Sequence, residues 1–221
     1  MITPSVALCA SCALITSASA SASFTGYSVE HVITASGRIR FQVFANFGQS
    51  NLVFLNAFSF VNLSGTMNAY HQDFFTAAGE VGTWQAGSSV SAADRGDDSW
   101  VTASGLVTSS GWGTALDPGF ANGGAVRDIN NGAGWYDATP GSANAIGAGG
   151  NQGGYRMLLM QVVRNTDDCL ETSSHSMQIS WKVAGTTTAI FGNGSFYLCF
   201  PAPGAMSLLL AGGIAQRRRR H

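Results

Sequence analysis

The chain has 221 residues, of which only 10% are charged, and its 11 Lys and Arg against 12 Asp and Glu give a formal net charge of −1 at pH 7. Four of the cationic residues lie at 217–220, so the rest of the chain is acidic, which argues against nucleic acid as a partner. Gly, Ser, Thr and Asn replace charged residues, as in many secreted β-rich proteins, and the length between the two ends suits one domain.

The first residues have the layout of a secretory signal peptide. Val6 to Ile15 is an apolar run, and small residues follow it, with A-x-A cleavage sites at 18–20 and 20–22. We therefore expect residues 1–22 to form a signal helix that directs export and is then removed. A buried N-terminal helix is the alternative, and the alternation of Ser and Ala from 17 to 23 disfavours it because these residues would make a poor core.

Residues 23–200 are expected to form one all-β domain. Apolar and polar residues alternate over 27–33, 38–47 and 176–183, which is typical of half-buried strands. The segments 51–63 and 155–164 are apolar on both faces, as central strands are, and a last strand is expected over 189–200, after a turn at 185–188. The predicted fold is an antiparallel two-sheet sandwich of jelly-roll type with about eight to ten strands. It would be flanked by the signal helix and a short apolar C-terminal helix.

The densest acidic cluster spans residues 94–98. Calcium takes roughly six to eight oxygen ligands, and Asp94, Asp97 and Asp98 could begin such a set. The spacing matches no EF-hand loop. We therefore prefer a solvated turn to a calcium site, and we predict no cofactor.

Residues 112–151 are rich in Gly, Asn and Ala, a composition typical of long surface loops, where binding sites are common. Trp112, Phe120, Trp135 and Tyr136 are candidates there for stacking on sugar rings, which gives an alternative function as a carbohydrate-binding or adhesion module. We prefer the interpretation that these rings cap the open end of the core, because aromatic side chains are mostly buried.

Two of the four cysteines belong to the signal peptide, and the domain keeps Cys169 and Cys199. An even pair in an oxidising compartment favours a disulfide over two free thiols. A hairpin closed by the turn at 185–188 would set Cys199 opposite Ser174, a few residues from Cys169, and this geometry independently supports the bridge.

The sequence carries no catalytic motif that we can identify. There is no Gly-x-Ser-x-Gly elbow, phosphate-binding loop or dinucleotide fingerprint. A pair of distant carboxylates, as in glycosidases, stays open as a possibility. A secreted hydrolase is therefore the third function considered, and we expect the protein not to be an enzyme.

The last residues form a three-part tail. The prolines in Pro201-Ala202-Pro203-Gly204 disfavour helix before them. The apolar run 205–215 would reach about 16 Å as a helix, whereas a free-standing span needs about 20 residues. The four terminal arginines would stay on the cytoplasmic side. An amphipathic helix or a nucleic-acid-binding patch is disfavoured, because the apolar run has no polar face and the basic run is strictly terminal.

This order of elements resembles the PEP-CTERM sorting tail of exported bacterial proteins, the substrates of exosortase-type membrane enzymes, with Ala202 in place of the family's Glu. The resemblance implies export machinery and a sorting enzyme as partners, transient membrane association through the tail, and delivery to the cell envelope or extracellular matrix. The carbohydrate-binding alternative would add extracellular polysaccharide as a partner. The residues on which it rests are Pro201, Ala202, Pro203, Gly204, Arg217, Arg218, Arg219 and Arg220.

A second, looser resemblance covers the domain itself. The segments GRIRFQVFANF, DDSWVTASG, GAGWYDATPG, YRMLLMQVV and ISWKVAGT are similar to a recurrent group of PEP-CTERM cargo proteins without an assigned activity. It implies a shared β fold and no site residues.

Two end signals flank a β domain without a catalytic motif. The predicted function is therefore an exported, non-catalytic envelope or matrix protein with 1–22 as signal peptide, 23–200 as cargo domain and 201–221 as sorting tail.

Overall fold

A computed structural model describes residues 24–71, 74–76, 79–81, 84, 96–103, 114–120, 127–137, 145–146, 155–170 and 172–198, with only the backbone at 74–76, 79–81, 145–146 and 169–170. In this part of the chain the protein is all-β, with strands and one short 3₁₀ helix. No helix of the described ranges is long and apolar enough to cross a membrane. The predicted signal helix and sorting tail lie outside these residues.

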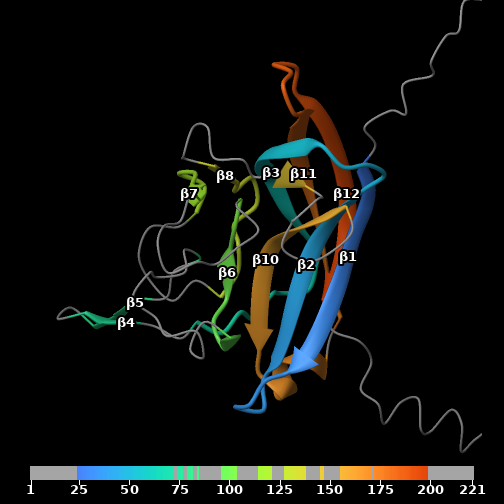
Figure 1. The fold of residues 1–221 in the computed structure, drawn as a ribbon. Coiled ribbons are helices and arrows are strands. Elements are labelled where there is room, and N and C mark those ends of the chain that lie inside the picture. Colours follow the sequence, from blue (N-terminus) through green and yellow to red (C-terminus); the bar gives the residue numbers. More distant parts are fainter. Residues whose placement is uncertain are drawn as a thin grey trace, which may run out of the picture.

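The elements follow one another along the chain as a series of long strands at the two ends and short strands between them (Figure 1). They are β1 (Phe24–Ile33), β2 (Ile39–Phe47), β3 (Leu52–Ser64), β4 (Phe74–Thr76), β5 (Gly79–Val81), β6 (Trp100–Val101), β7 (Thr114–Leu116), β8 (Trp135–Asp137), β9 (Ala145–Ile146), β10 (Arg156–Arg164), the 3₁₀ helix η1 (Thr166–Leu170), β11 (Ser173–Val183) and β12 (Ile190–Leu198).

The smaller sheet has four strands in the order β1-β2-β10-β6, and all neighbours are antiparallel. The first two strands form a hairpin in which Gly37 has a φ of 82°, a conformation that glycine adopts without steric cost. Alternate residues of β2 point into the core, which confirms the strand predicted from its period of two. These buried residues are Phe41, Val43, Ala45 and Phe47.

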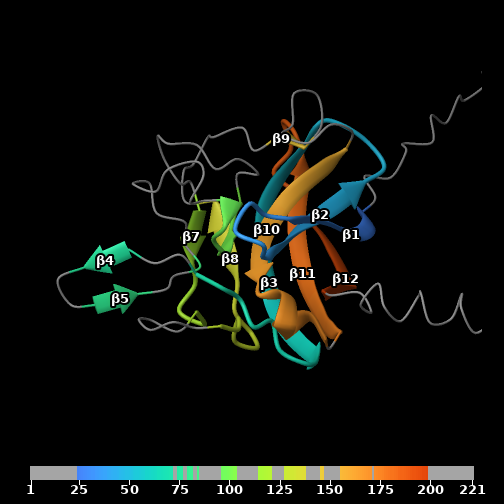
Figure 2. The ribbon, with the colours of Figure 1, turned by 90° about the horizontal axis from the view of Figure 1, so that it is seen from below.

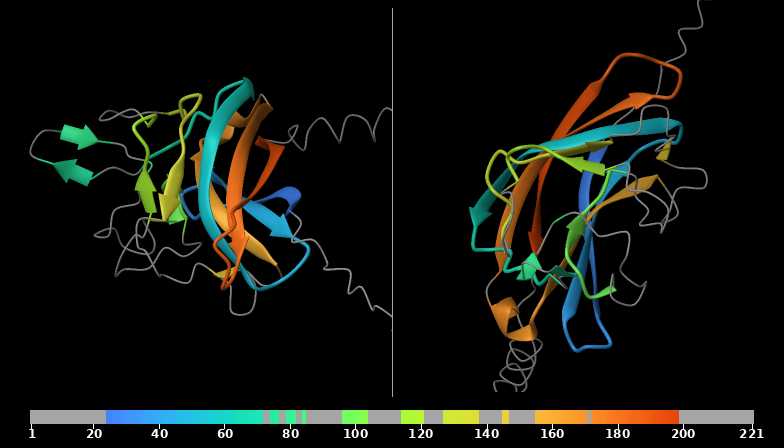
Figure 3. Two further views of the ribbon diagram at one scale, coloured as in Figure 1. Left: turned by 90° about the horizontal axis from the view of Figure 1, so that it is seen from above. Right: turned by 90° about the vertical axis from the view of Figure 1, so that its left-hand side faces the viewer.

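The larger sheet has the order β12-β11-β3-β8-β7, and β9 also pairs with β3. Figure 3 shows β3 and β11 side by side in this sheet. The chain changes sheet after β2, on both sides of β6 and on both sides of β10, while β1–β2 and β11–β12 are hairpins within one sheet. The predicted two-sheet antiparallel sandwich is therefore confirmed. Strands β4 and β5 pair only with each other, and their hairpin projects away from both sheets (Figure 2).

The core lies between the two sheets and takes its side chains from the inward faces of both. The buried residues Phe54, Met177 and Trp181 belong to the larger sheet, and Val43 and Leu159 belong to the smaller one. Strand β10 is buried on its other face as well, where Leu158 packs with Phe44 and Trp100. Burial on both faces confirms β10 as the central strand that its continuous apolar sequence predicts.

The two sheets meet at one edge, where β1 lies beside β12. Both strands are edge strands of their own sheets. Gly192 and Gly194 of β12 face the rings of Phe24 and Tyr27, and a Cβ at Gly192 would lie 2.9 Å from Phe24 Cδ1. The two glycines therefore leave the space that these rings occupy.

The register of the last hairpin differs from the prediction. Ser174 pairs with Tyr197, so the predicted pairing with Cys199 is wrong by two residues. The reason is an early turn, since Gly185 has a φ of 82° and the Thr186 amide donates to the Val183 carbonyl at 3.0 Å. The Cys169 side chain and Cys199 lie outside the described residues. Their bridge stays a prediction, which mass spectrometry of unreduced peptides would test.

Candidate functional site

Two of the rings proposed for ligand stacking belong to the core. Trp135 is only 1% exposed, and its indole Nε1 donates to the Thr102 carbonyl at 3.0 Å. Phe120 is also buried, and its ring centroid lies 6.1 Å from that of Trp135 in an edge-on arrangement. This burial agrees with the preferred interpretation that the rings belong to the core. It rules out the alternative that Trp135 stacks on a sugar, because no ligand ring can reach it. Trp112 lies outside the described residues.

The remaining ring behaves differently. Tyr136 follows Trp135 directly, and successive residues of a strand point to opposite faces. Its side chain is 45% exposed, on the outside of the larger sheet. Tyr136 is therefore the one described member of the predicted set that a ligand can reach.

The described part of the acidic cluster, residues 96–98, is not a solvated turn, which corrects the preferred interpretation for Asp97 and Asp98. Asp98 is buried, and its Oδ1 accepts a hydrogen bond from the Ser99 amide at 2.9 Å and lies 3.6 Å from His71 Nδ1. The Asp98 carbonyl accepts from Gln161 Nε2 at 2.8 Å. These contacts attach the segment to β10.

Asp97 is held by cations of the first hairpin. Its Oδ2 lies 3.6 Å from Nη1 of Arg38. Burial raises the pKa of Asp97, but hydrogen bonds from Ser36 and Thr34 and the charges of Arg38 and Arg40 outweigh it, so the pKa lies below its usual value. The described residues contain no group of three or more His, Cys, Asp or Glu that could hold a metal ion, and Asp94 lies outside them.

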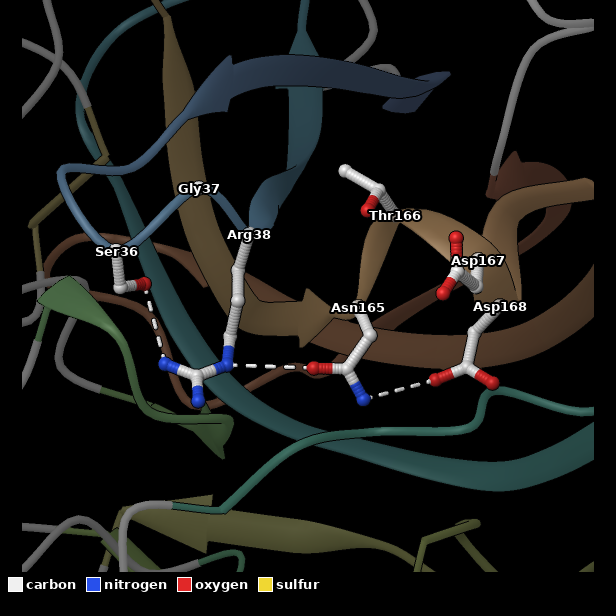
Figure 4. A pocket seen from close by; sticks show the side chains of 7 residues that line it. All are labelled: Ser36, Gly37, Arg38, Asn165, Thr166, Asp167 and Asp168. Carbon is white, nitrogen blue, oxygen red and sulfur yellow. Dashed lines mark hydrogen bonds between the residues drawn. The ribbon is translucent and has the colours of Figure 1, made fainter.

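A polar pocket of about 450 Å³ lies beside this cluster, between the β1–β2 turn and η1. Figure 4 shows the Arg38 guanidinium between Ser36 and Asn165, and the Asn165 amide directed at Asp168. The same guanidinium lies 3.6 Å from the centroid of the Tyr70 ring. The Arg38 guanidinium thus contacts Ser36, Asn165, Asp97 and Tyr70. These contacts hold the β1–β2 hairpin against the rest of the domain.

The pocket does not have the arrangement of a glycosidase. Its two carboxylates, Asp167 and Asp168, are consecutive residues of η1, and the opposite wall carries Ser36 and Arg38. Glycosidases place two carboxyl groups across the scissile bond from each other. The pair of facing carboxylates that a glycosidase would need is absent among the described lining residues.

A second polar cluster lies inside the sandwich and has the order of a catalytic relay. His175 Nε2 is 2.9 Å from Ser173 Oγ, and His175 Nδ1 is 2.9 Å from Asn62 Oδ1. The Asn62 amide nitrogen donates to the Ile129 carbonyl at 2.9 Å, which fixes Oδ1 as the atom facing His175. Because this oxygen only accepts, Nδ1 carries the proton and Nε2 accepts from the serine hydroxyl.

This cluster is closed to solvent. His175 is 0% exposed and Ser173 is buried, and the imidazole packs against the rings of Phe60 and Phe196 at centroid distances of 5.6 and 5.5 Å. Burial, and secondarily the charge of Arg164, lower the pKa of His175 to about 4. A substrate cannot reach the serine, so the network acts as a structural link between β3 and β11.

The outer face of the larger sheet carries the exposed rings of Tyr136 and Phe191 and the exposed amide of Gln178. Between the rings, Asn56 is half-buried and Ser180 is buried. Cross-strand pairing places Tyr136 beside Asn56, Asn56 beside Ser180 and Ser180 beside Phe191, which makes one row across four strands. Gln178 is the next residue of β11 on the same face, two positions before Ser180, and it pairs with Phe58 of β3. We call these six residues the outer sheet face. Apart from Tyr136, sequence reasoning missed them, although Phe191 on the polar side of the last strand was a usable signal.

The comparisons with known proteins add no relative. No protein-family model, curated protein or solved structure matches this chain.

Proposed function

We propose that the protein is an exported, non-catalytic component of the cell envelope or extracellular matrix, sorted through its C-terminal tail. One observation carries the proposal: the order of Pro201 to Gly204, an uncharged apolar run and four terminal arginines. An apolar run of this length is short for a permanent anchor. It suits transient insertion into the membrane, where an exosortase-type enzyme then processes the protein.

The end segments belong to the same proposal. Residues 1–22 act as a signal helix that leads the chain into the export machinery, and 205–215 form a short apolar helix during transit. The cargo domain then extends from about residue 23 to residue 200, and extracellular polysaccharide is its expected environment.

The interior of the domain supports a non-catalytic role over a secreted hydrolase. In the one Ser-His-Asn relay of the described residues, Ser173 and His175 are buried, and the imidazole packs against two aromatic rings, while Asn62 is half-buried. The carboxylates of the pocket lie side by side on η1. Neither cluster offers a nucleophile or an acid–base pair to a substrate.

The test is the replacement of the four arginines in a bacterium that has an exosortase-type enzyme, beside an isogenic strain without it. Substitution of Arg217 to Arg220 by Gln should shift the protein between cell fractions and leave the precursor mass unchanged by processing. Substitution of the same residues by Lys is the matched control, because it keeps the charge and should keep the sorting. An unchanged location and mass for the Gln variant would overturn the proposal.

A further inference from the structure

We propose that the outer sheet face binds a neutral polysaccharide, which lies across the strands between the exposed rings of Tyr136 and Phe191. The inference concerns the folded domain alone, so it does not depend on how the tail is processed. It rests on the pairing register of four strands, on the exposure of the two rings and on the absence of acidic side chains among the six residues of the face.

The two rings are placed to hold the two ends of a short oligosaccharide. Tyr136 lies on β8 and Phe191 on β12, and β3 and β11 run between them. Neighbouring strands are about 4.8 Å apart, so three steps separate the two backbones by roughly 14 Å. Phe191 is 67% exposed, and its position is supported by an edge-on contact with Phe58 at 6.2 Å. Exposed rings that are fixed by a sheet offer contact area at a low entropic cost.

The strands between the rings supply hydrogen-bonding groups. Ser180 is itself buried, and its Oγ donates to Asn56 Oδ1 at 2.5 Å. This bond orients the asparagine so that its amide nitrogen points away from Ser180. Gln178 is exposed on the same face. A side-chain amide combines an acceptor with two donors, and this combination matches the hydroxyl groups of a sugar, each of which both donates and accepts.

The charge of the face selects among ligands. Of the described outward residues of β11, Ser174, Ser176, Gln178 and Ser180 are uncharged, and Lys182 stands at the end of the strand. A ligand with many carboxylates or phosphates would meet no matching row of cations here. A neutral sugar does not need cations in order to bind, so the face favours an uncharged glycan.

The same composition disfavours a second copy of the chain or another protein as the occupant. The centres of protein interfaces are enriched in aromatic residues, Met and Arg and depleted in Ser. Here the amide side chains of Asn56 and Gln178 occupy the accessible centre, above the buried Ser180, and the rings lie at the two ends. A hydroxylated ligand fits this order better than an apolar surface does.

The experiment uses the full-length chain and isothermal titration with neutral hexasaccharides (β-1,4-glucan, β-1,3-glucan, α-1,4-glucan and β-mannan), with oligogalacturonate as the acidic probe. At least one neutral hexasaccharide should bind, and Tyr136→Ala and Phe191→Ala should each weaken it by about tenfold. Gln178→Ala should weaken it as well, and Tyr136→Phe should keep most of the affinity because the ring is retained.

Two exposed residues outside the face provide matched controls. Tyr155 is 48% exposed and Ile33 is 70% exposed, so Tyr155→Ala and Ile33→Ala remove similar surface elsewhere and should leave binding unchanged. Light scattering is run on the same samples. The proposal is overturned if no neutral hexasaccharide binds, if binding survives the three face variants, if oligogalacturonate binds more tightly, or if the face variants only dissociate a dimer.

Discussion

The ring of Tyr27 lies against the backbone of Gly194, where a Cβ would come within 3.1 Å of its Cδ2 and Cε2 atoms. The Tyr27 hydroxyl donates to the Met177 carbonyl at 3.0 Å. Burial raises the pKa of this phenol well above its usual value, so it keeps the proton that the hydrogen bond needs. Since β1 and β12 belong to different sheets, one side chain both packs and bonds across the edge of the sandwich.

Gly192 gives the sharpest test of this edge. In Gly192→Ala the added methyl group would lie 2.9 Å from Phe24 Cδ1 and 3.0 Å from the Trp181 ring, so we expect a loss of about 1–3 kcal/mol, as for other overpacked sites. The measurement is urea unfolding. Gly96→Ala is the control, because its Cβ would meet Arg40 Nη1 at 3.5 Å, and it should leave the midpoint unchanged. Equal midpoints for both variants would contradict the close packing.

The long strands could be predicted because each carries its own signal. Alternation in β2 and continuous apolar character in β10 follow from burial on one face or on both, and the structure confirms both. The environment of Asp98 could not be predicted in this way. Its partners His71 and Gln161 are distant in sequence, and a run rich in Asp is locally indistinguishable from a solvated turn.

Only part of the outer sheet face could be predicted from the sequence, for a similar reason. The polar side of β11 can be read from the alternation of Ser and Gln with apolar residues. The position of Tyr136 beside Asn56 depends instead on β8 joining the edge of β3, a contact between short and distant segments. Periodicity defines a face of one strand, whereas the strand order that assembles a site depends on long-range pairing.

His175 should make the stability of the fold depend on pH between about 4 and 6.5. In this range the unfolded chain binds a proton on the histidine and the folded protein does not, so stability falls as the pH falls. The total loss is on the order of 3 kcal/mol. His175→Gln should flatten the curve of unfolding free energy against pH, while His31→Gln, outside the Ser173–Asn62 network, should keep it. The same slope in His175→Gln and wild type would refute the assignment.

Asp97 should affect the stability of the fold at a lower pH than His175 does. Because its pKa in the folded protein lies below the ordinary value of 3.8, its stabilising effect is complete above that value and is lost as the pH falls through the folded pKa. Asp97→Asn should therefore reduce the fall in melting temperature below about pH 4 and destabilise the neutral protein by about 1 kcal/mol or less. Asp167→Asn, on the exposed side of the pocket, is the matched carboxylate control and should resemble wild type in melting curves from neutral to acidic pH.

Trp135 and Tyr136 are consecutive residues with opposite roles, and alanine substitutions should separate them. Trp135→Ala removes a buried indole, so we expect a loss of about 3–5 kcal/mol, and it leaves the Thr102 carbonyl without the indole donor. Tyr136→Ala removes an exposed ring and should change the free energy of unfolding by at most about 0.5 kcal/mol. Denaturant unfolding of the two variants measures the difference. If Tyr136→Ala is the more damaging change, the face assignment of β8 is reversed, and with it the row that joins Tyr136 to Asn56, Ser180 and Phe191.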